Sequence, residues 1–247
     1  AGFTGEALEN MLKEFGCDTA FIRLPEGSTR INVKINAGEE TEINGQGPVI
    51  TEEAQQALFE QLDALKKEDI LVLAGSIPNT LPSDIYERIL EHLQGRGIHF
   101  VVDATKELLL KVLKYHPFLI KPNNHELGEM FGVTLKTRDE IVTYAKKLQE
   151  MGAENVLVSM AGDGAILLTE DGIIYKAKPP KGKVLNSVGA GDSMVAGFLT
   201  GYLNTGEYEK AFRLGVVTGS ATAFQYWLAT KEDIVALMED KPETYGL

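Results

Sequence analysis

The sequence predicts an α/β protein with a mainly parallel central sheet. From residue 51 onward, amphipathic helical stretches alternate with short apolar runs, which is the pattern of βαβ units. Polar or glycine-rich turns follow these apolar runs, at the end of the strands where open parallel sheets bind ligands. At 247 residues the chain is long enough for one large α/β domain or two smaller ones.

The first part of the chain has a different pattern. Apolar residues on one helical face predict a helix over Glu6–Phe15, and a strand is predicted over residues 19–23. Residues 29–35 then alternate between apolar and polar side chains. The chain turns at residues 36–39 and resumes its alternation at 41–43, so we predict a β-hairpin.

This hairpin is the one insert with a period of two, so we expect it to form a small β-sheet lid, residues 28–44. The main domain then comprises residues 1–27 and 45–247. The polar face of the hairpin carries Arg30, Asn32 and Lys34. A guanidinium offers a fork of donors to a phosphate, so Arg30 is the candidate for binding an anionic substrate and Lys34 is a weaker one. The alternative is an ordinary solvated face.

The remaining elements belong to the main domain. Helices are predicted over residues 52–65, 82–93, 106–113, 138–151, 207–214, 216–227 and 231–238, besides the helix discussed next. Strands are predicted over residues 70–73, 100–102, 118–120, 156–159, 165–168 and 172–175, the last two forming a hairpin. None of the apolar runs approaches the roughly 20 residues that a transmembrane helix needs, so no membrane partner is expected.

The stretch from Asn186 to Asp192 reads as a loop that leads into a helix, because apolar residues at helical spacing follow it. In this stretch Gly189, Ala190 and Gly191 can turn tightly and aim successive amide donors at a phosphate. Asp192 comes directly after them, where a carboxylate can accept the proton of a hydroxyl that attacks the bound phosphoryl group. The alternative is a helix cap, with Asp192 as the N-cap and turn glycines before it.

Further polar residues follow the other apolar runs and are expected to converge at the same edge of the sheet. These residues are Gly75, Ser76, Asp103, Lys121, Asn123, Glu126, Ser159, Gly162 and Gly164. Six of them have a structural alternative. Asn123 and Glu126 have the spacing of a helix-start capping box, the two later glycines suit a plain hairpin loop, Lys121 suits a surface charge and Ser76 a turn.

Composition narrows the classes of partner. The chain has 36 acidic and 24 basic residues and a formal net charge of -12, so neither a nucleic acid nor an anionic membrane is expected as a partner. Cys17 is the single cysteine, which rules out a disulfide within the chain and a metal site built on cysteines. A reducing, cytoplasmic setting is the simplest expectation.

Four motifs together resemble those of the ribokinase-like (PfkB) carbohydrate kinases. The motifs are Asn186–Asp192, Lys121–Glu126, Gly75–Pro78 and Ser159–Gly164, and their order matches the family over nearly the whole chain. The resemblance implies a ribokinase-like, three-layer α/β/α sandwich with a small β-sheet lid. Within the family, Thr29–Asn32 and Ser159–Gly164 are most similar to the branch that phosphorylates fructose 1-phosphate or tagatose 6-phosphate.

The resemblance implies an ATP-dependent enzyme that converts fructose 1-phosphate to fructose 1,6-bisphosphate, with tagatose 6-phosphate as the alternative substrate. It implies Asp192 as catalytic base and the amides of Gly189, Ala190 and Gly191 as an anion hole. Mg²⁺ would be held through water by Asn123 and Glu126. The nucleotide side would be lined by Lys121, Asn123, Glu126, Ser159, Gly162 and Gly164. The sugar phosphate would contact Arg30, Asn32, Ser76 and Asp192.

Three expectations remain open. Members of the family carry a further N-terminal segment with a first strand and a glycine-rich loop, and we expect that segment to be missing from this sequence rather than from the protein. The apolar face formed by Ile31, Val33 and Ile35 predicts a homodimer through the lid. The alternative from another class is a non-catalytic module that binds a nucleotide or a sugar phosphate, although binding alone needs no base such as Asp192.

Overall fold

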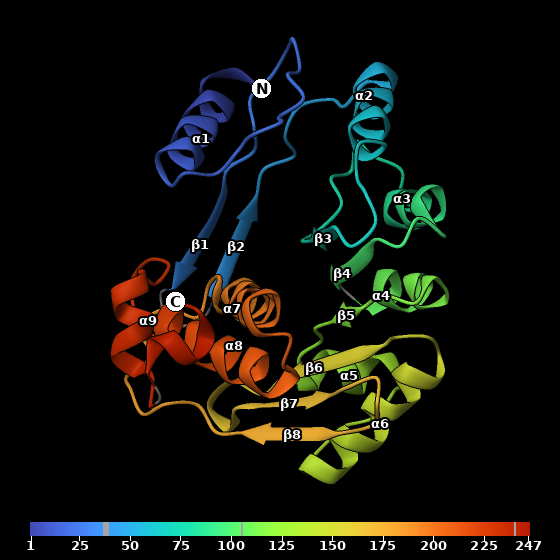
Figure 1. Ribbon diagram of the computed structural model, residues 1–247. Helices are drawn as coiled ribbons and strands as arrows, with labels where there is room; N and C mark the ends of the chain where they lie inside the picture. Colours follow the sequence, from blue (N-terminus) through green and yellow to red (C-terminus); the bar gives the residue numbers. More distant parts are fainter. Residues whose placement is uncertain (37–39, 105, 240) are drawn as a thin grey trace. The chain divides into compact units, whose positions relative to one another are not determined.

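The computed structural model describes residues 1–36, 40–104, 106–239 and 241–247 (Figure 1). Contacts between residues divide the chain into two compact units. The first unit comprises Ala1–Asp69 and Ser76–Ile98, and the second comprises Ile70–Gly75 and His99–Leu247. Within the described residues, no helix combines the length and the apolar character that crossing a membrane requires.

The first unit contains helix α1 (Gly2–Glu14), an antiparallel hairpin of β1 (Asn32–Asn36) and β2 (Glu40–Asn44), and helices α2 (Glu52–Leu62) and α3 (Ile85–Leu93). The hairpin confirms the alternation in the sequence, with Asn32 opposite Asn44. Residues 37–39 of the predicted turn lie outside the described residues. The Thr51 hydroxyl accepts a hydrogen bond from the Ala54 amide and so begins α2.

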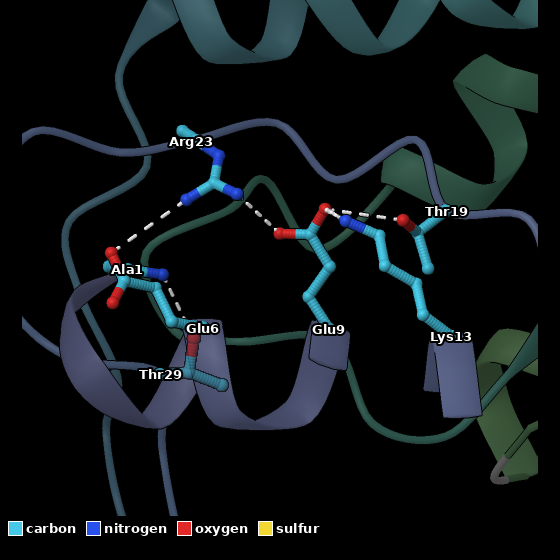
Figure 2. A network of polar contacts seen from close by, with 7 residues as sticks. All are labelled: Ala1, Glu6, Glu9, Lys13, Thr19, Arg23 and Thr29. Carbon is cyan, nitrogen blue, oxygen red and sulfur yellow. Dashed lines mark hydrogen bonds and ion pairs between the residues drawn. The ribbon is translucent and has the colours of Figure 1, made fainter. Parts of the chain in front are cut away.

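The strand predicted over residues 19–23 is wrong, because this segment forms no strand. Its polar side chains are instead tied to α1 around the largely buried Glu9 (Figure 2). The Glu9 carboxylate accepts hydrogen bonds from Lys13 Nζ at 2.8 Å, Thr19 Oγ1 at 3.2 Å and Arg23 Nη2 at 2.6 Å. The bond from Lys13, followed by that from Thr19 and the charge of Arg23, lowers the pKa of Glu9. Side-chain bonds to a helix therefore fix this segment in place of a strand ladder.

The second unit is built on one sheet, with the described strands in chain order from β3 to β8. They are β3 (Ile70–Ala74), β4 (His99–Asp103), β5 (Leu119–Ile120), β6 (Asn155–Ser159), β7 (Ala165–Leu168) and β8 (Ile174–Ala177). The strands from β3 to β6 pair in parallel, whereas β6, β7 and β8 pair antiparallel. The mainly parallel sheet and its terminal hairpin confirm the prediction.

Helices cover both faces of this sheet (Figure 1). They are α4 (Lys106–Val112), α5 (Asn124–Met130), α6 (Arg138–Glu150), α7 (Ala190–Thr205) and α8 (Tyr208–Ala223). Helix α9 (Lys231–Leu237) packs against α8. Alternate strand residues such as Leu119, Leu157 and Leu167 pack against Phe198 of α7 and Phe212 of α8. The residues between them point to the face covered by α4, α5 and α6, which gives the three layers that the resemblance implied.

The sequence wrongly predicted a break between two helices in this unit. The sequence predicted separate helices on either side of Gly215, whereas α8 runs through it without interruption. The reason is close packing, because a Cβ at Gly215 would lie 2.9 Å from the Met194 carbonyl oxygen of α7. Gly197 and Gly219 approach the facing backbone just as closely. The contact between the two helices thus offsets the poor helix propensity of glycine.

Candidate active site

The glycine loop begins helix α7. Gly189 is the N-cap, with a φ of 78° that glycine adopts without strain. The Ala190 amide donates to the Ser187 carbonyl at 3.2 Å, which closes the turn, and Gly191 and Asp192 are the second and third residues of the helix. Asp192 is exposed and is not the N-cap, so this part of the structural alternative is wrong. The positive end of the helix dipole and an exposed carboxylate thus lie within one turn of each other.

Lys121 lies directly beside this loop. Its side chain is only 8% exposed, and its Nζ lies 3.2 Å from Asp103 Oδ2. A Cβ at Gly191 would stand 3.1 Å from the same Nζ, so the ammonium group contacts the backbone of the loop. Lys121 is therefore no surface charge. It adds a buried cation to the amides and the helix dipole on one side of the loop.

Two further carboxylates, those of Asp192 and Glu126, lie near the Asp103 side chain that pairs with Lys121. Burial raises the pKa of Asp103, the charge and hydrogen bond of Lys121 oppose that rise, and the nearby negative charges of Asp192 and Glu126 add to it. Asp103 ends β4, and Lys121 follows β5, so neighbouring parallel strands deliver them to one edge of the sheet. The cluster carries more negative than positive charge, which favours a bound cation.

Asn123 and Glu126 form a capping box at the start of α5. Asn123 Oδ1 accepts from the Glu126 amide and Glu126 Oε2 accepts from the Asn123 amide, each at 2.8 Å. This is the structural alternative that the spacing allowed. The second Glu126 carboxylate oxygen takes no part in this cap, and hard oxygens suit Mg²⁺. No group of three His, Cys, Asp or Glu side chains in the described part of the chain is placed to hold a metal alone, so waters or phosphates would complete the shell.

Ser159 joins this edge of the sheet, since its amide donates to the Pro122 carbonyl at 3.1 Å and it forms a parallel bridge with Asn123. Gly162 lies exposed in the short turn that follows. Gly164 has a φ of 91°, and a Cβ there would collide with the Ala177 carbonyl. The hairpin itself therefore requires Gly164, as the structural alternative stated.

Arg30 and Ser76 come together within the first unit. Arg30 Nη2 donates to Ser76 Oγ at 3.1 Å, and both residues border exposed surface. The backbone at Gly47 packs along the Arg30 stem, which holds the guanidinium in place. Asn32 begins β1 and is exposed. The weaker candidate Lys34 has a side chain that lies outside the described atoms.

Sequence reasoning missed two parts of this arrangement. Asp103 was placed at the correct end of its strand but received no role, because only the fold shows its pairing with Lys121. The sequence shows Asn186 only as part of a motif, whereas its side chain makes two hydrogen bonds in the structure. In the sequence, position was the only signal for these roles. Asp103 ends a predicted strand, and Asn186 precedes Gly189 by three residues.

Residues 1–232 match the pfkB family of carbohydrate kinases. The 1-phosphofructokinase of Bacillus subtilis is 53% identical over 239 residues, which cover 97% of this chain and 78% of the relative. The D-tagatose-1-phosphate kinase of Bacillus licheniformis is 36% identical over 224 residues, 90% of this chain and 73% of that one. Both matches span nearly all of the chain, so the similarity is not confined to the glycine loop.

Among solved structures, the phosphofructokinase-2 of Escherichia coli in complex with substrates and products is similar throughout. Its TM-score is 0.88 at 28% identity, and the match covers 96% of this chain and 78% of that one. The similarity therefore extends over both of the units described above.

Proposed function

The chain belongs to the pfkB family of carbohydrate kinases, as its motifs predicted, and from this premise we propose that it phosphorylates fructose 1-phosphate with ATP. The product would be fructose 1,6-bisphosphate. One observation carries the assignment of the reacting groups. Asp192 stands in the first turn of α7, directly after a glycine loop that contacts the buried Lys121 ammonium. This arrangement supports a base next to an anion site.

In the proposed reaction, the free primary hydroxyl of the sugar phosphate attacks the γ-phosphorus of ATP. Its proton passes to the Asp192 carboxylate, and the bond between the γ-phosphorus and the bridging oxygen of ADP breaks. The amides of Gly189, Ala190 and Gly191 and the Lys121 ammonium stabilise the negative charge of the transferring group. Ser159 and Gly162 would line the nucleotide side of the site. Positioning and charge stabilisation account for the rate, since the protein forms no covalent bond.

We also propose that Mg²⁺ binds with the nucleotide and is held in part by the Glu126 carboxylate and the Asn123 amide oxygen, because hard oxygen ligands suit this ion. When bound, the ion would neutralise charge on the phosphates. Glu126 and Asn123 would reach it through water, because Asn123 Oδ1 and Glu126 Oε2 already cap α5. A cytoplasmic location, which the single cysteine favoured, fits a reaction that consumes ATP.

The substrate class rests on Arg30 and Ser76. A guanidinium held by a serine hydroxyl at 3.1 Å suits the phosphate already present on the sugar. We propose that residues 28–44 act as the lid that carries this group, with Asn32 as a further polar contact to the sugar. The relatives named for fructose 1-phosphate and for tagatose 1-phosphate phosphorylation act on sugars that differ at one hydroxyl. Tagatose 6-phosphate remains the alternative substrate.

An ADP-release assay on the purified protein tests the reaction. The panel holds fructose 1-phosphate, tagatose 1-phosphate, fructose 6-phosphate, tagatose 6-phosphate and ribose, each with Mg·ATP. We expect turnover to be fastest with fructose 1-phosphate. Preferred turnover of tagatose 6-phosphate would select the alternative substrate. Thermal stabilisation by ATP or a sugar phosphate without turnover would instead select the non-catalytic binding module.

Replacing Arg30 by alanine is expected to raise the KM for fructose 1-phosphate about tenfold to 100-fold, because a charge-assisted hydrogen bond to the phosphate is lost. The KM for ATP should stay within about twofold, since the nucleotide does not use this group. Arg213→Ala is the matched control, because Arg213 pairs with Glu209 on an exposed face of α8. Unchanged kinetics for fructose 1-phosphate in the Arg30 variant would contradict the phosphate role.

We further propose that the lid forms a homodimer. Four side chains of the hairpin region are exposed apolar groups, namely Ile31 (63%), Val33 (45%), Ile35 (44%) and Ile43 (58%). Val33 and Ile43 face each other across the hairpin, so they lie on one apolar face. An unpaired strand edge beside an apolar face favours pairing with a second copy.

A glutamate at Val33 is expected to shift the protein from dimer to monomer in light scattering, because it places a charge in the apolar face. Leu203→Glu is the control, since Leu203 is 67% exposed on α7 and is not part of the hairpin. A monomeric mass for the unaltered protein would remove the proposal.

A further inference from the structure

The last residue of α8 and the segment after it, residues 223–229, are bound to the chain leading into the glycine loop. The Ala223 carbonyl accepts hydrogen bonds from the amides of Leu185 at 2.9 Å and Asn186 at 3.2 Å. Thr222 is linked to Ser193 of α7 at 2.8 Å, and its hydroxyl accepts from the Ala229 amide at 3.2 Å. We call residues 223–229 the strap.

Asn186 connects the strap with the loop through its side chain. Its Oδ1 accepts from the Val188 amide at 3.1 Å, which folds the residues before Gly189 into a turn. Its Nδ2 donates to the Tyr226 carbonyl at 3.2 Å, which holds the middle of the strap. One amide group therefore fixes two backbone segments that lie 40 residues apart in the sequence.

The strap also contacts the loop itself. A Cβ at Gly189 would stand 2.8 Å from Leu228 Cδ2, so this leucine packs on the N-cap of α7. Tyr226, Trp227 and Leu228 are 73%, 85% and 65% exposed, so little apolar burial fixes this part of the strap. Polar bonds such as that from Asn186 are accordingly the main restraint on the strap where it meets the loop.

We propose that Asn186 is a positioning residue for phosphoryl transfer, because it fixes the glycine loop by tying it to the strap. This inference rests on the proposed function, in which the amides of that loop receive the phosphates of ATP. Preformed amides stabilise a transferring phosphoryl group without reorganisation. A loop released from the strap loses that advantage while Asp192 and Lys121 remain in the protein.

The test compares Asn186→Ala and Asn186→Ser with the unaltered enzyme. Serine can accept a hydrogen bond from the Val188 amide but cannot reach the Tyr226 carbonyl, so this variant distinguishes the effects of the two hydrogen bonds. We expect both variants to lower kcat/KM for ATP about tenfold to 100-fold, the cost of a misplaced reacting geometry. The KM for ATP should rise while the KM for fructose 1-phosphate stays within about twofold. A general loss of folded enzyme would instead lower kcat and leave both KM values unchanged.

The anisotropy of Trp227 provides a second readout, because it is the only tryptophan of the chain and adjoins Tyr226. We expect its fluorescence anisotropy to fall in both variants as the strap gains motion. Asn204→Ala is the matched control, since Asn204 Nδ2 donates to the Tyr245 carbonyl at 3.1 Å at the far end of α7. The control should keep the kinetics and anisotropy of the unaltered enzyme.

Two outcomes would overturn the inference. Kinetics in Asn186→Ser that equal those of the unaltered enzyme would show that the tie to Tyr226 does not position the loop. An equal fall of kcat/KM in Asn204→Ala would show that any loss of an asparagine bond on these segments has the same effect. Failure of the proposed function is separate, because the unaltered enzyme would then show no turnover at all.

Discussion

Replacing Asp192 by asparagine is expected to lower kcat about 10³-fold, because the attacking hydroxyl loses its proton acceptor. The side chain keeps its size, and the amides and Lys121 stay in place, so the affinity for ATP should be retained. Stopped assays that measure ADP give kcat, and isothermal titration gives the Kd for ATP. A decrease in kcat with an unchanged Kd is the signature of a group used in the chemical step.

Asp139→Asn is the matched control for this experiment. Asp139 also lies in the first turn of a helix, α6, where its carboxylate pairs with Lys176 at 3.3 Å. The Asp139→Asn variant should leave kcat unchanged, since it removes only an exposed ion pair. An Asp192→Asn enzyme with the turnover of the unaltered protein would remove Asp192 as the base.

Replacing Lys121 by methionine is expected to have the second-largest effect. The variant leaves the Asp103 carboxylate without its ammonium partner, which should lower the free energy of unfolding by about 3 kcal/mol. This is the low end of such losses, because the Asp103 side chain keeps 19% exposure. We also expect kcat to fall about 100-fold, as for the loss of one donor to a developing oxyanion. Chemical denaturation and the ADP assay measure the two effects.

The pH dependence of this variant follows from Asp103. Burial already raises its pKa above the ordinary value of 3.8, and removing Lys121 raises the pKa further. The folded protein then binds more protons than the unfolded chain, so stability falls as pH rises above the unfolded pKa. The loss of unfolding free energy in the Lys121→Met variant should therefore be smaller in mildly acidic buffer than at neutral pH.

The double variant Asp103→Asn, Lys121→Met separates stability from activity. Removing both charges should recover most of the lost stability, since no buried charge is left unpaired. Activity should not return, because the cation beside Gly191 is still missing. A single Lys121→Met variant as stable as the unaltered protein would contradict the buried pair.

The parallel sheet could be predicted from the sequence, because each strand is a local apolar run. The helices between these runs act as crossovers, which bring successive strands into the sheet in the same direction. The start of α7 was predicted for a similar reason, since Gly189 needs its positive φ whatever surrounds it. The break at Gly215 could not be predicted correctly, because the backbone of α7 packs against it only in the folded protein.

The residues of the candidate site could be predicted from motifs, but the contacts between them could not. The sequence placed Lys121, Asn123 and Asp192 at one edge of the sheet, yet it could not show whether the ammonium was buried or which carboxylate it met. The two bonds of Asn186 depend on a strap that follows α8 much later in the chain. Pairings of this kind depend on the whole fold, so no local pattern reports them.

The close approach of α7 and α8 at Gly197, Gly215 and Gly219 has a consequence for how this part of the protein opens. With so little side chain between the two backbones, neither helix can slide or turn against the other without a collision. The pair must therefore separate as one cooperative unit, in which the loss of either helix exposes the other. Asp192, the proposed base on the first turn of α7, is thereby as stable against local unfolding as the buried length of α8.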